Sequence, residues 1–241
     1  MSIEATRAVL KAFLTARWRA VRLRTMQDLK AHQRRGLQSW RAHVAEAFPH
    51  IKSERLAMDK ATLMSDFAAF NQGGFTADEV RNGLDTGYVR PGIACGTSTG
   101  TSGNRGLYVI TDHERYQWLG TILAKGLPDV WRRRHRVAVI LPQSSALYQA
   151  GNQSRWLKLQ FYDLRQEPEA WAQALEDFSP TVLIAPPKVL RWLAENRSER
   201  LHPQRVFSGA ETPDPPDQRV IEAGFALKLG QIYMATEGLF A

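Results

Sequence analysis

The sequence predicts an α/β protein in which a multi-stranded sheet is flanked by helices and preceded by a helical amino-terminal segment. From residue 93 onward, short aliphatic runs typical of strands alternate with amphipathic segments of helical periodicity. Residues 1–70 instead contain few glycines and have large apolar residues at helical spacing. We therefore expect a helical segment over residues 1–70 and an α/β core over residues 71–241, both in one domain.

The amino-terminal helices are expected over residues 1–47 and 55–70, followed by a glycine-containing break at 71–74. Leu10, Leu14 and Trp18 follow helical spacing, so this basic region is interpreted as an amphipathic helix rather than a transit peptide. The strands expected after the break are 93–95, 107–110, 136–141, 156–162, 182–185, 205–208 and 225–233. The helices expected there are 113–125, 167–178, 187–195 and 216–223.

The composition is that of a soluble globular protein without a membrane span. A hydrophobic content of 44% allows a sizeable core. The longest apolar run covers residues 137–141, far short of the roughly 20 residues that cross a bilayer. The single cysteine, Cys95, excludes an internal disulfide and a multi-cysteine metal site. We therefore expect a cytoplasmic protein and interpret Cys95 as a buried core thiol.

The net charge of +8 is concentrated in two basic clusters, at residues 17–36 and 132–136. Surfaces of this kind attract nucleic acid, an anionic membrane or an acidic protein. No recognisable nucleic-acid-binding module accompanies the clusters. We therefore expect no nucleic-acid partner, and a basic nucleic-acid-binding protein is kept only as a rival function.

The most informative segment is a loop at residues 96–106, which has four glycines, five hydroxyl side chains and no apolar residue. Glycines let the backbone approach a ligand, and successive N–H groups and hydroxyls can surround phosphate oxygens. The loop joins two strand-like runs and matches neither the Walker nor the dinucleotide-binding pattern. It resembles the phosphate-binding loop of adenylate-forming enzymes. The resemblance implies ATP binding by Ser98, Thr99, Gly100, Thr101, Ser102 and Gly103, with Arg105 as a catalytic positive charge.

A second motif of the same family follows the last expected strand. Residues 233–237 resemble its Tyr-Gly-x-Thr-Glu pattern, in which the ring stacks on adenine and the threonine bonds the α-phosphate. The carboxylate of that pattern offers the hard oxygen ligand that Mg²⁺ prefers. The resemblance therefore implies that Tyr233 binds the nucleotide, that Thr236 and Glu237 are catalytic, and that Glu237 holds Mg²⁺.

A third motif lies between these two. Residues 207–213 resemble the small-residue turn, often Gly-Ala-Glu-Pro, that lines the adenine in the phenylacetate–coenzyme A ligase branch of the superfamily. The resemblance implies that Gly209, Ala210 and Glu211 contact the nucleotide. It covers residues 60–241 and identifies residues 71–241 as a nucleotide-binding core similar to the large N-terminal domain of adenylate-forming enzymes.

The resemblance implies ATP- and Mg²⁺-dependent activation of a carboxylic acid, preferably an aromatic acid such as a hydroxybenzoate, to an acyl-adenylate. The acyl group would pass to coenzyme A or an acyl carrier protein, as some relatives do in aryl polyene pigment biosynthesis. The basic surface would suit an acidic carrier protein. The expected acid-pocket walls are Leu141, Pro142, Tyr148, Ala185 and Ala235. A non-catalytic nucleotide-binding module is the alternative.

The sequence departs from the family pattern in two places. The usual Pro-Lys at the end of the phosphate loop is Arg105-Gly106, so the positive charge is displaced. The sequence ends at Ala241, before the family's ribose-binding acid and its lysine-bearing C-terminal domain. We therefore expect this chain to be poorly active by itself.

Overall fold

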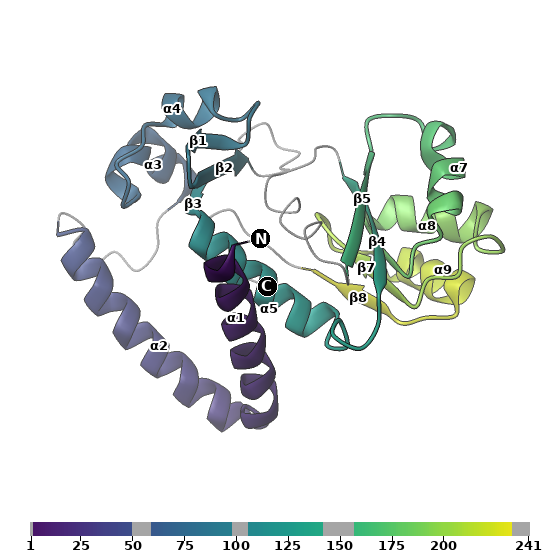
Figure 1. The fold of residues 1–241 in the computed structure, drawn as a ribbon, viewed down its shortest axis with the longest axis horizontal. Helices are drawn as coiled ribbons and strands as arrows, with labels where there is room; N and C mark the ends of the chain where they lie inside the picture. Colours follow the sequence, from purple (N-terminus) through teal and green to yellow (C-terminus); the bar gives the residue numbers. More distant parts are fainter. Residues whose placement is uncertain (1, 50–58, 98–105, 142–156, 233–241) are drawn as a thin grey trace. The chain divides into compact units, whose positions relative to one another are not determined.

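The computed structural model describes residues 2–49, 59–97, 106–141 and 157–232, which belong to two compact units (Figure 1). The amino-terminal unit comprises Arg7–Lys125, and the carboxyl-terminal unit comprises Met1–Thr6 and Gly126–Ala241. Each unit contains one sheet with a hydrophobic core of its own. The expected α/β class is therefore confirmed, and the boundary at residue 70 stays a prediction.

The amino-terminal unit contains an antiparallel sheet in the order β1-β2-β3. Its strands are β1 (Tyr88–Arg90), β2 (Ile93–Thr97) and β3 (Leu107–Thr111). Its described helices are α1 (Ile3–Arg22), α2 (Met26–Ala47), α3 (Lys60–Ser65), the 3-10 helix η1 (Phe67–Phe70), α4 (Ala77–Asn82) and α5 (Asp112–Gly126). Phe67, Phe75 and Val80 lie in the core of this unit together with buried side chains of β2 and β3. The elements α4 and β1 were not predicted, because each is too short to show a periodic pattern.

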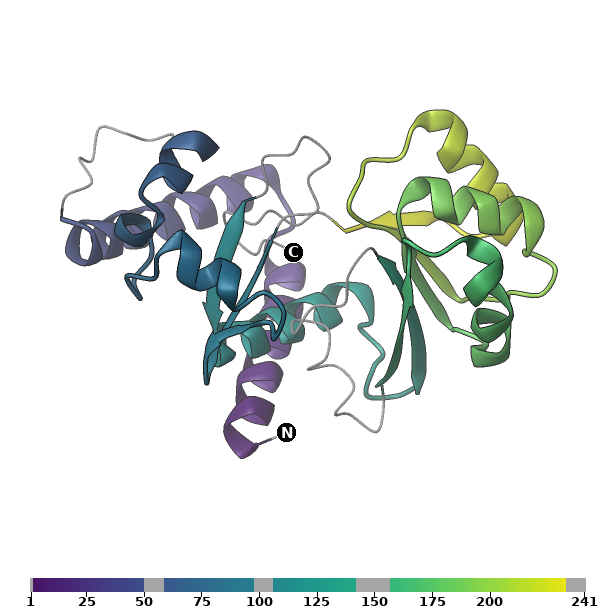
Figure 2. The same ribbon diagram turned by 90° about the horizontal axis from the view of Figure 1, so that it is seen from above.

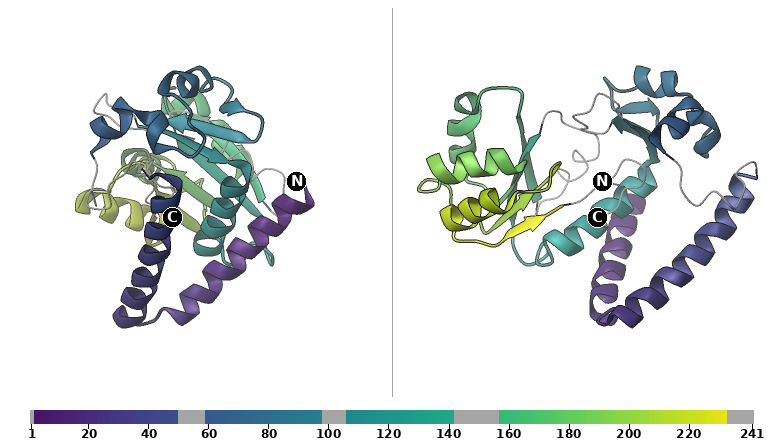
Figure 3. Two further views of the ribbon diagram at one scale, coloured as in Figure 1. Left: turned by 90° about the vertical axis from the view of Figure 1, so that its left-hand side faces the viewer. Right: turned by 180° about the vertical axis from the view of Figure 1, so that it is seen from behind.

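The helical stretch expected over residues 1–47 consists of the two helices α1 and α2 (Figure 3). Asp28 N donates a hydrogen bond to Thr25 Oγ1 (3.1 Å) and Thr25 N donates one to the Asp28 carboxylate (3.1 Å), so a capping box begins α2. α1 packs on α5, where a Cβ on Gly120 would come within 2.2 Å of the Val9 carbonyl oxygen. Glycine therefore permits the close approach of these helices. None of the described helices is long and apolar enough to cross a membrane.

The carboxyl-terminal unit contains a five-stranded parallel sheet in the order β5-β4-β6-β7-β8. Its strands are β4 (His135–Leu141), β5 (Leu157–Asp163), β6 (Val182–Ala185), β7 (Arg205–Ser208) and β8 (Leu229–Gln231), and its described helices are α7 (Pro168–Phe178), α8 (Pro187–Asn196) and α9 (Pro215–Phe225). Ile140 and Leu183 share one core with residues of all three helices, so these helices cover the same face of the sheet (Figure 2). Successive crossovers in one direction and of one hand produce this arrangement.

The observed bounds agree with the expected strands and helices to within a few residues, with two exceptions. The helix expected over 55–70 is described only from residue 59, where it consists of the short helix α3 and the 3-10 helix η1. The second exception lies near the end of the described chain. The strand expected over 225–233 begins only at Leu229. Phe225 still belongs to α9 and packs against the sheet core, and Ala226 ends the helix with a left-handed φ of 52°. The sequence around residue 225 has a strand-like local pattern, but the packing of Phe225 against the core keeps this residue in the helix.

Candidate functional site

Five strand ends meet at the carboxyl edge of the parallel sheet, and the strand order reverses there between β4 and β6. From β4 the chain passes to β5 on one side, whereas β6, β7 and β8 follow on the other side. In open parallel sheets, ligands bind outside the carboxyl ends of the strands at such a reversal, because the connections diverge there. The carboxyl edge beside β4 and β6 is therefore the candidate site.

Two of the predicted pocket residues end the strands at this reversal. Leu141 is the last residue of β4 and is half-buried, so its side chain can contact a ligand at the edge. Ala185 ends β6, but its side chain is fully buried in the core that contains Leu190 of α8. The structure thus places Ala185 beneath the edge. The predicted wall residues Pro142, Tyr148 and Ala235 lie outside the described residues.

The predicted adenine turn follows β7 at the same edge. The buried Ser208 Oγ donates a hydrogen bond to the Glu211 carbonyl oxygen (3.1 Å) and closes the turn. The Gly209 N–H donates to the Ala185 carbonyl oxygen (3.1 Å) and ties the turn to β6. Ala210 has a φ of 68°, in the left-handed region, which costs an L-residue roughly 1–2 kcal/mol. Strained backbone of this kind is concentrated at ligand-binding sites.

The turn lies beside the end of β8, the strand that leads into the second motif. Ser208 pairs with Gln231, and the Ile232 N–H donates to the Ser208 carbonyl oxygen (2.8 Å). The structure therefore brings the turn and the residues just before the second motif to neighbouring strand ends. Tyr233, Thr236 and Glu237 lie outside the described residues, so their roles stay predictions.

The predicted phosphate loop connects the two strands of a hairpin in the amino-terminal unit, as expected from the sequence. Antiparallel pairing of β2 and β3 extends to Thr97 and Leu107. Tyr108 lies opposite Gly96, and a Cβ on Gly96 would come within 2.3 Å of the Tyr108 hydroxyl oxygen. The absence of a side chain at Gly96 therefore lets the tyrosine ring cover β2 at this position. Ser98, Thr99, Gly100, Thr101, Ser102, Gly103 and Arg105 lie outside the described residues.

No family model matches the chain, and no curated protein matches it. Among solved structures, the chain is similar to the Klebsiella oxytoca NpsA N-terminal subdomain in complex with 3-hydroxyanthranilyl-AMSN. The sequence identity is 18%, the match covers 57% of this chain and 36% of that chain, and the TM-score is 0.38. The chain is also similar to an open conformation of 2-hydroxyisobutyryl-CoA ligase in complex with 2-HIB-AMP and CoA. There the identity is 18%, the match covers 81% of this chain and 51% of the ligase, and the TM-score is 0.46. The chain thus spans 36% and 51% of the lengths of these two proteins.

An ion pair that sequence reasoning missed lies at the end of β5, the neighbour of β4. The Arg165 guanidinium donates hydrogen bonds to both carboxylate oxygens of Asp163, from Nε at 2.9 and 3.1 Å and from Nη2 at 2.6 Å. These hydrogen bonds lower the pKa of Asp163 to about 2, so the carboxylate is ionised at neutral pH. The signal in the sequence is an acid at a strand end with an arginine two residues later. The pair adds a fixed carboxylate and a guanidinium to the candidate edge.

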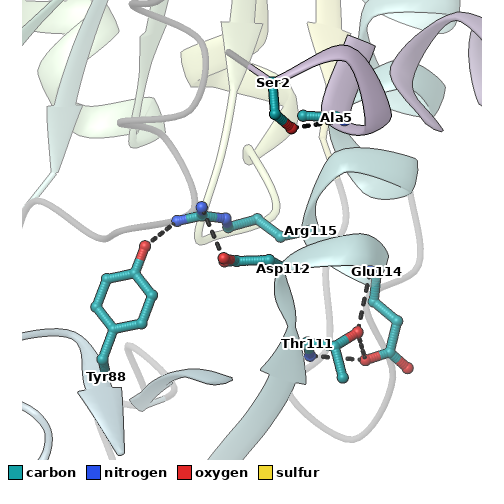
Figure 4. Close-up of polar contacts among 7 residues, drawn as sticks. All are labelled: Ser2, Ala5, Tyr88, Thr111, Asp112, Glu114 and Arg115. Carbon is teal, nitrogen blue, oxygen red and sulfur yellow. Dashed lines mark hydrogen bonds and ion pairs between the residues drawn. The ribbon is translucent and has the colours of Figure 1, made fainter. Parts of the chain in front are cut away.

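A second unpredicted polar cluster lies at the start of α5 in the amino-terminal unit (Figure 4). Arg115 is buried, forms an ion pair with Asp112 (2.9 Å) and donates a hydrogen bond to the Tyr88 hydroxyl. Thr111 and Glu114 form a reciprocal cap, in which Thr111 Oγ1 donates to the Glu114 carboxylate (2.8 Å) and Glu114 N donates to Thr111 Oγ1 (3.2 Å). The cluster joins β1 and β3 to the helix at the end of the hairpin opposite residues 98–105. Its role is therefore to hold the hairpin in place.

The described part of the chain offers neither a reactive cysteine nor a metal cluster. Cys95 is buried, and its Sγ donates to the Val80 carbonyl oxygen at 3.8 Å. Burial raises the pKa of the Cys95 thiol above its ordinary value, so it stays protonated at neutral pH and is a core thiol, as expected. No group of three His, Cys, Asp or Glu within the described ranges is placed to hold a metal ion. The predicted Mg²⁺ ligand, Glu237, lies outside those ranges.

Proposed function

We propose that this chain binds ATP and activates a carboxylic acid as an acyl-adenylate. One observation supports this function: the small-residue turn after β7 and the end of β8 are hydrogen-bonded neighbours at the carboxyl edge of the sheet. Two of the sequence motifs that resemble adenylate-forming enzymes occupy or follow these two strand ends. Segments separated along the chain thus converge at the edge where parallel sheets bind their ligands.

In this proposal the adenine lies against the turn. Gly209 and Ala210 have little or no side chain, so a flat base can contact the backbone there. A Cβ on Gly209 would find its nearest neighbour, Ile184, at an ordinary contact distance of 3.8 Å, so the turn is not crowded on that side. Glu211 is exposed and can reach a bound nucleotide. Tyr233, which follows β8, would supply the stacking ring.

The phosphates would be bound by the glycine- and hydroxyl-rich loop. Backbone N–H groups and hydroxyls of residues 98–103 would donate hydrogen bonds to the phosphate oxygens, and Arg105 would add a charge-assisted donor. Thr236 would donate to the α-phosphate. Glu237 has the hard oxygen ligands that Mg²⁺ requires, and the ion would offset negative charge on the phosphates.

The proposed reaction needs no nucleophile from the protein. An oxygen of the substrate carboxylate attacks the α-phosphorus of ATP, and a bond forms between this oxygen and the phosphorus. The bond from the α-phosphorus to the bridging oxygen breaks, and the electron pair leaves with pyrophosphate. Such transfers depend on positioning and charge neutralisation, which the loop and the edge would supply.

We further propose that the acid is aromatic, for example a hydroxybenzoate, and that the acyl group passes to the thiol of coenzyme A or of an acyl carrier protein. The half-buried Leu141, at the end of β4 where the strand order reverses, is the described residue proposed to contact the acid. The basic character of the chain suits an acidic carrier protein as acceptor.

Exchange of labelled pyrophosphate into ATP tests this function directly, because exchange requires reversible formation of the acyl-adenylate. We expect exchange that depends on Mg²⁺ and on an added acid, and that is faster with hydroxybenzoates than with short aliphatic acids. ATP binding by calorimetry without exchange for any acid would identify a non-catalytic nucleotide-binding module. Absence of both would overturn the proposal.

A loop variant separates phosphate binding from folding. Gly103→Val should weaken ATP binding about tenfold and leave the unfolding temperature unchanged, because a segment without apolar side chains contributes little to a hydrophobic core. Gly36→Val, in the exposed helix α2, is the matched control. Equal ATP affinity of both variants would remove the loop from the nucleotide site.

A further inference from the structure

Helix α2 presents an apolar stripe to solvent. It has 22 residues, none of which is buried. Met26, Leu29, Leu37 and Trp40 occupy positions i, i+3, i+11 and i+14, which lie on one face of a helix. All four are exposed, Trp40 at 57%. Helices in proteins draw most of their stability from packing an apolar face against another surface. The apolar face of α2 is suited to such packing, but it is exposed to solvent in the described part of the chain.

Helix α1 carries apolar residues on two separate faces. Val9 and Phe13 are buried on the first face, where α1 approaches α5. Leu10, Leu14 and Trp18 recur at every fourth position, so they form a second stripe. All three are exposed, Trp18 at 58%. One stripe of α1 thus builds the unit, and the other faces solvent like the stripe of α2.

Basic side chains accompany both stripes. Between residues 5 and 45 the sequence contains a single acid, Asp28, and its carboxylate caps α2. The same segment has lysine or arginine at positions 7, 11, 17, 19, 22, 24, 30, 34, 35 and 41. The Arg22 guanidinium carbon lies 5.2 Å from the centroid of the Trp18 ring. On α1, a cation and an exposed aromatic ring therefore share one surface.

We propose that α1 and α2 bind the surface of an anionic lipid bilayer, with their apolar stripes at the headgroup–acyl boundary and their basic side chains on the headgroups. Amphipathic helices that combine Lys and Arg with Trp and Leu lie in this interface. Tryptophan is favoured at that depth, and each stripe contains one, Trp18 and Trp40. Lys11 and Lys30 are exposed next to stripe residues, and their long side chains can extend to lipid phosphates.

Charge and surface chemistry favour a lipid surface over two other occupants. A nucleic acid would contact the basic residues but leave the apolar stripes in water. A second copy of the chain would bring the same basic segment against itself, and like charges oppose association. An anionic bilayer accepts both components, and it conforms to side chains that project from two separate helices.

Co-sedimentation of the full chain with vesicles tests this surface. We expect binding to vesicles of equal parts phosphatidylcholine and phosphatidylglycerol, little binding to phosphatidylcholine alone, and weaker binding as salt is raised. Vesicle binding requires neither ATP nor a carboxylic acid, so a failure of adenylation leaves this result unaffected. Equal binding to both kinds of vesicle, or binding to neither, would overturn the proposal.

Paired variants separate the stripes from general charge. The double variants Trp18→Ser with Trp40→Ser, and Lys11→Glu with Lys30→Glu, should each reduce binding at least about tenfold. The matched controls are Trp131→Ser, which removes an exposed tryptophan of the carboxyl-terminal unit, and Arg132→Glu with Arg134→Glu, which changes net charge equally in the other basic cluster. Both controls should bind like the original chain.

Two further measurements keep the test decisive. Circular dichroism and unfolding temperature should be unchanged in all variants, because every substituted side chain is exposed. A loss of binding that is equal in the stripe variants and the controls would refute a specific surface. Sedimentation equilibrium showing a dimer that the Trp18→Ser and Trp40→Ser changes dissociate, without vesicle binding, would assign the stripes to a second copy instead.

Discussion

Each sheet contains a strand glycine covered by an aromatic ring of the neighbouring strand, and the comparison of the two shows how the position of a strand within its sheet limits its movement. Gly96 pairs with Tyr108 in the antiparallel sheet, and Gly230 pairs with Phe207 in the parallel sheet. An added Cβ would come within 2.3 Å of the Tyr108 hydroxyl oxygen or 2.4 Å of a Phe207 ring carbon. Each glycine lies just before a predicted ATP-binding segment, so the last described stretch of strand before each segment has a ring packed on it.

The surroundings of the two glycines differ. β2 is the central strand of its sheet and pairs along its whole length with β3, whereas β8 has three residues and lies at the edge of its sheet. A central strand cannot move without breaking the ladders on both of its sides, and an edge strand has a ladder on one side only. The predicted ATP-binding segment 98–103 therefore follows a firmly held strand, and the second predicted motif follows a less constrained one.

The largest expected effect concerns the motif that follows the edge strand. Glu237→Gln should slow Mg²⁺-dependent pyrophosphate exchange at least about 100-fold, the scale of losing one well-placed electrostatic group. Glu199→Gln, an exposed acid after α8, is the matched control and should exchange normally. An unchanged rate in Glu237→Gln would remove this carboxylate from the site and leave the parallel edge without its proposed metal ligand.

The two glycines can be compared directly. Gly96→Val should lower the free energy of unfolding by about 2–3 kcal/mol, and Gly230→Val by about 1 kcal/mol, because the edge strand can shift to relieve the overlap. Urea denaturation measures both. The loss at Gly96 should shrink in a Tyr108→Ala background, where the overlap is gone. Equal losses at the two positions would show that strand position is irrelevant.

The amino edge of the parallel sheet predicts a pH effect that the carboxyl edge should not show. His135 begins β4 and is buried, and its Nε2 lies 3.4 Å from the Asp129 carboxylate, which also pairs with Arg205 (2.9 Å). Burial lowers the pKa of His135 although Asp129 opposes the shift, and the charges of Arg205 and Arg133 add to it. Below pH about 6.5 the unfolded chain takes up a proton at this histidine that the folded protein does not. The free energy of unfolding therefore decreases as the pH is lowered.

Urea denaturation between pH about 7.5 and about 5 checks this expectation. His135→Asn should flatten the pH dependence of the unfolding free energy. His202→Asn, at an exposed histidine, should leave it as it was. An identical slope in both variants would contradict a role for the buried histidine.

The smallest effect concerns the strained turn at the carboxyl edge. Ala210→Gly should raise the free energy of unfolding by about 0.5–1 kcal/mol, because glycine adopts a positive φ without the steric cost of a Cβ. Ala223→Gly, inside α9, should lower it by a similar amount. Weaker ATP binding in Ala210→Gly would indicate that the nucleotide relieves the strain, because the variant would no longer gain this relief on binding. A loss of stability would show that Ala210 is not strained.

Much of the secondary structure was predictable because it follows local periodicity. The strands β6 and β7 have the predicted bounds, and α7 and α8 agree to within a residue, since apolar spacing and helix-starting prolines are written in the sequence. The ends of β2 and β3 on either side of residues 98–105 were also predictable, because the glycine- and hydroxyl-rich composition begins there. The roles of residues 98–105 and 233–237 stay predictions.

The sequence by itself determined most of the described strands and helices, and it predicts a phosphate-binding segment between β2 and β3. Only the tertiary structure decided that the strands form two sheets, that β4 and β6 flank the reversal of strand order, and that the turn at Ala210 lies beside the end of β8. It also decided that the Ala185 side chain is buried beneath the edge, and that Arg115 pairs with Asp112 and Tyr88. The physical reason is that periodicity depends on residues a few positions apart, whereas strand pairing and burial depend on contacts between segments far apart in the chain.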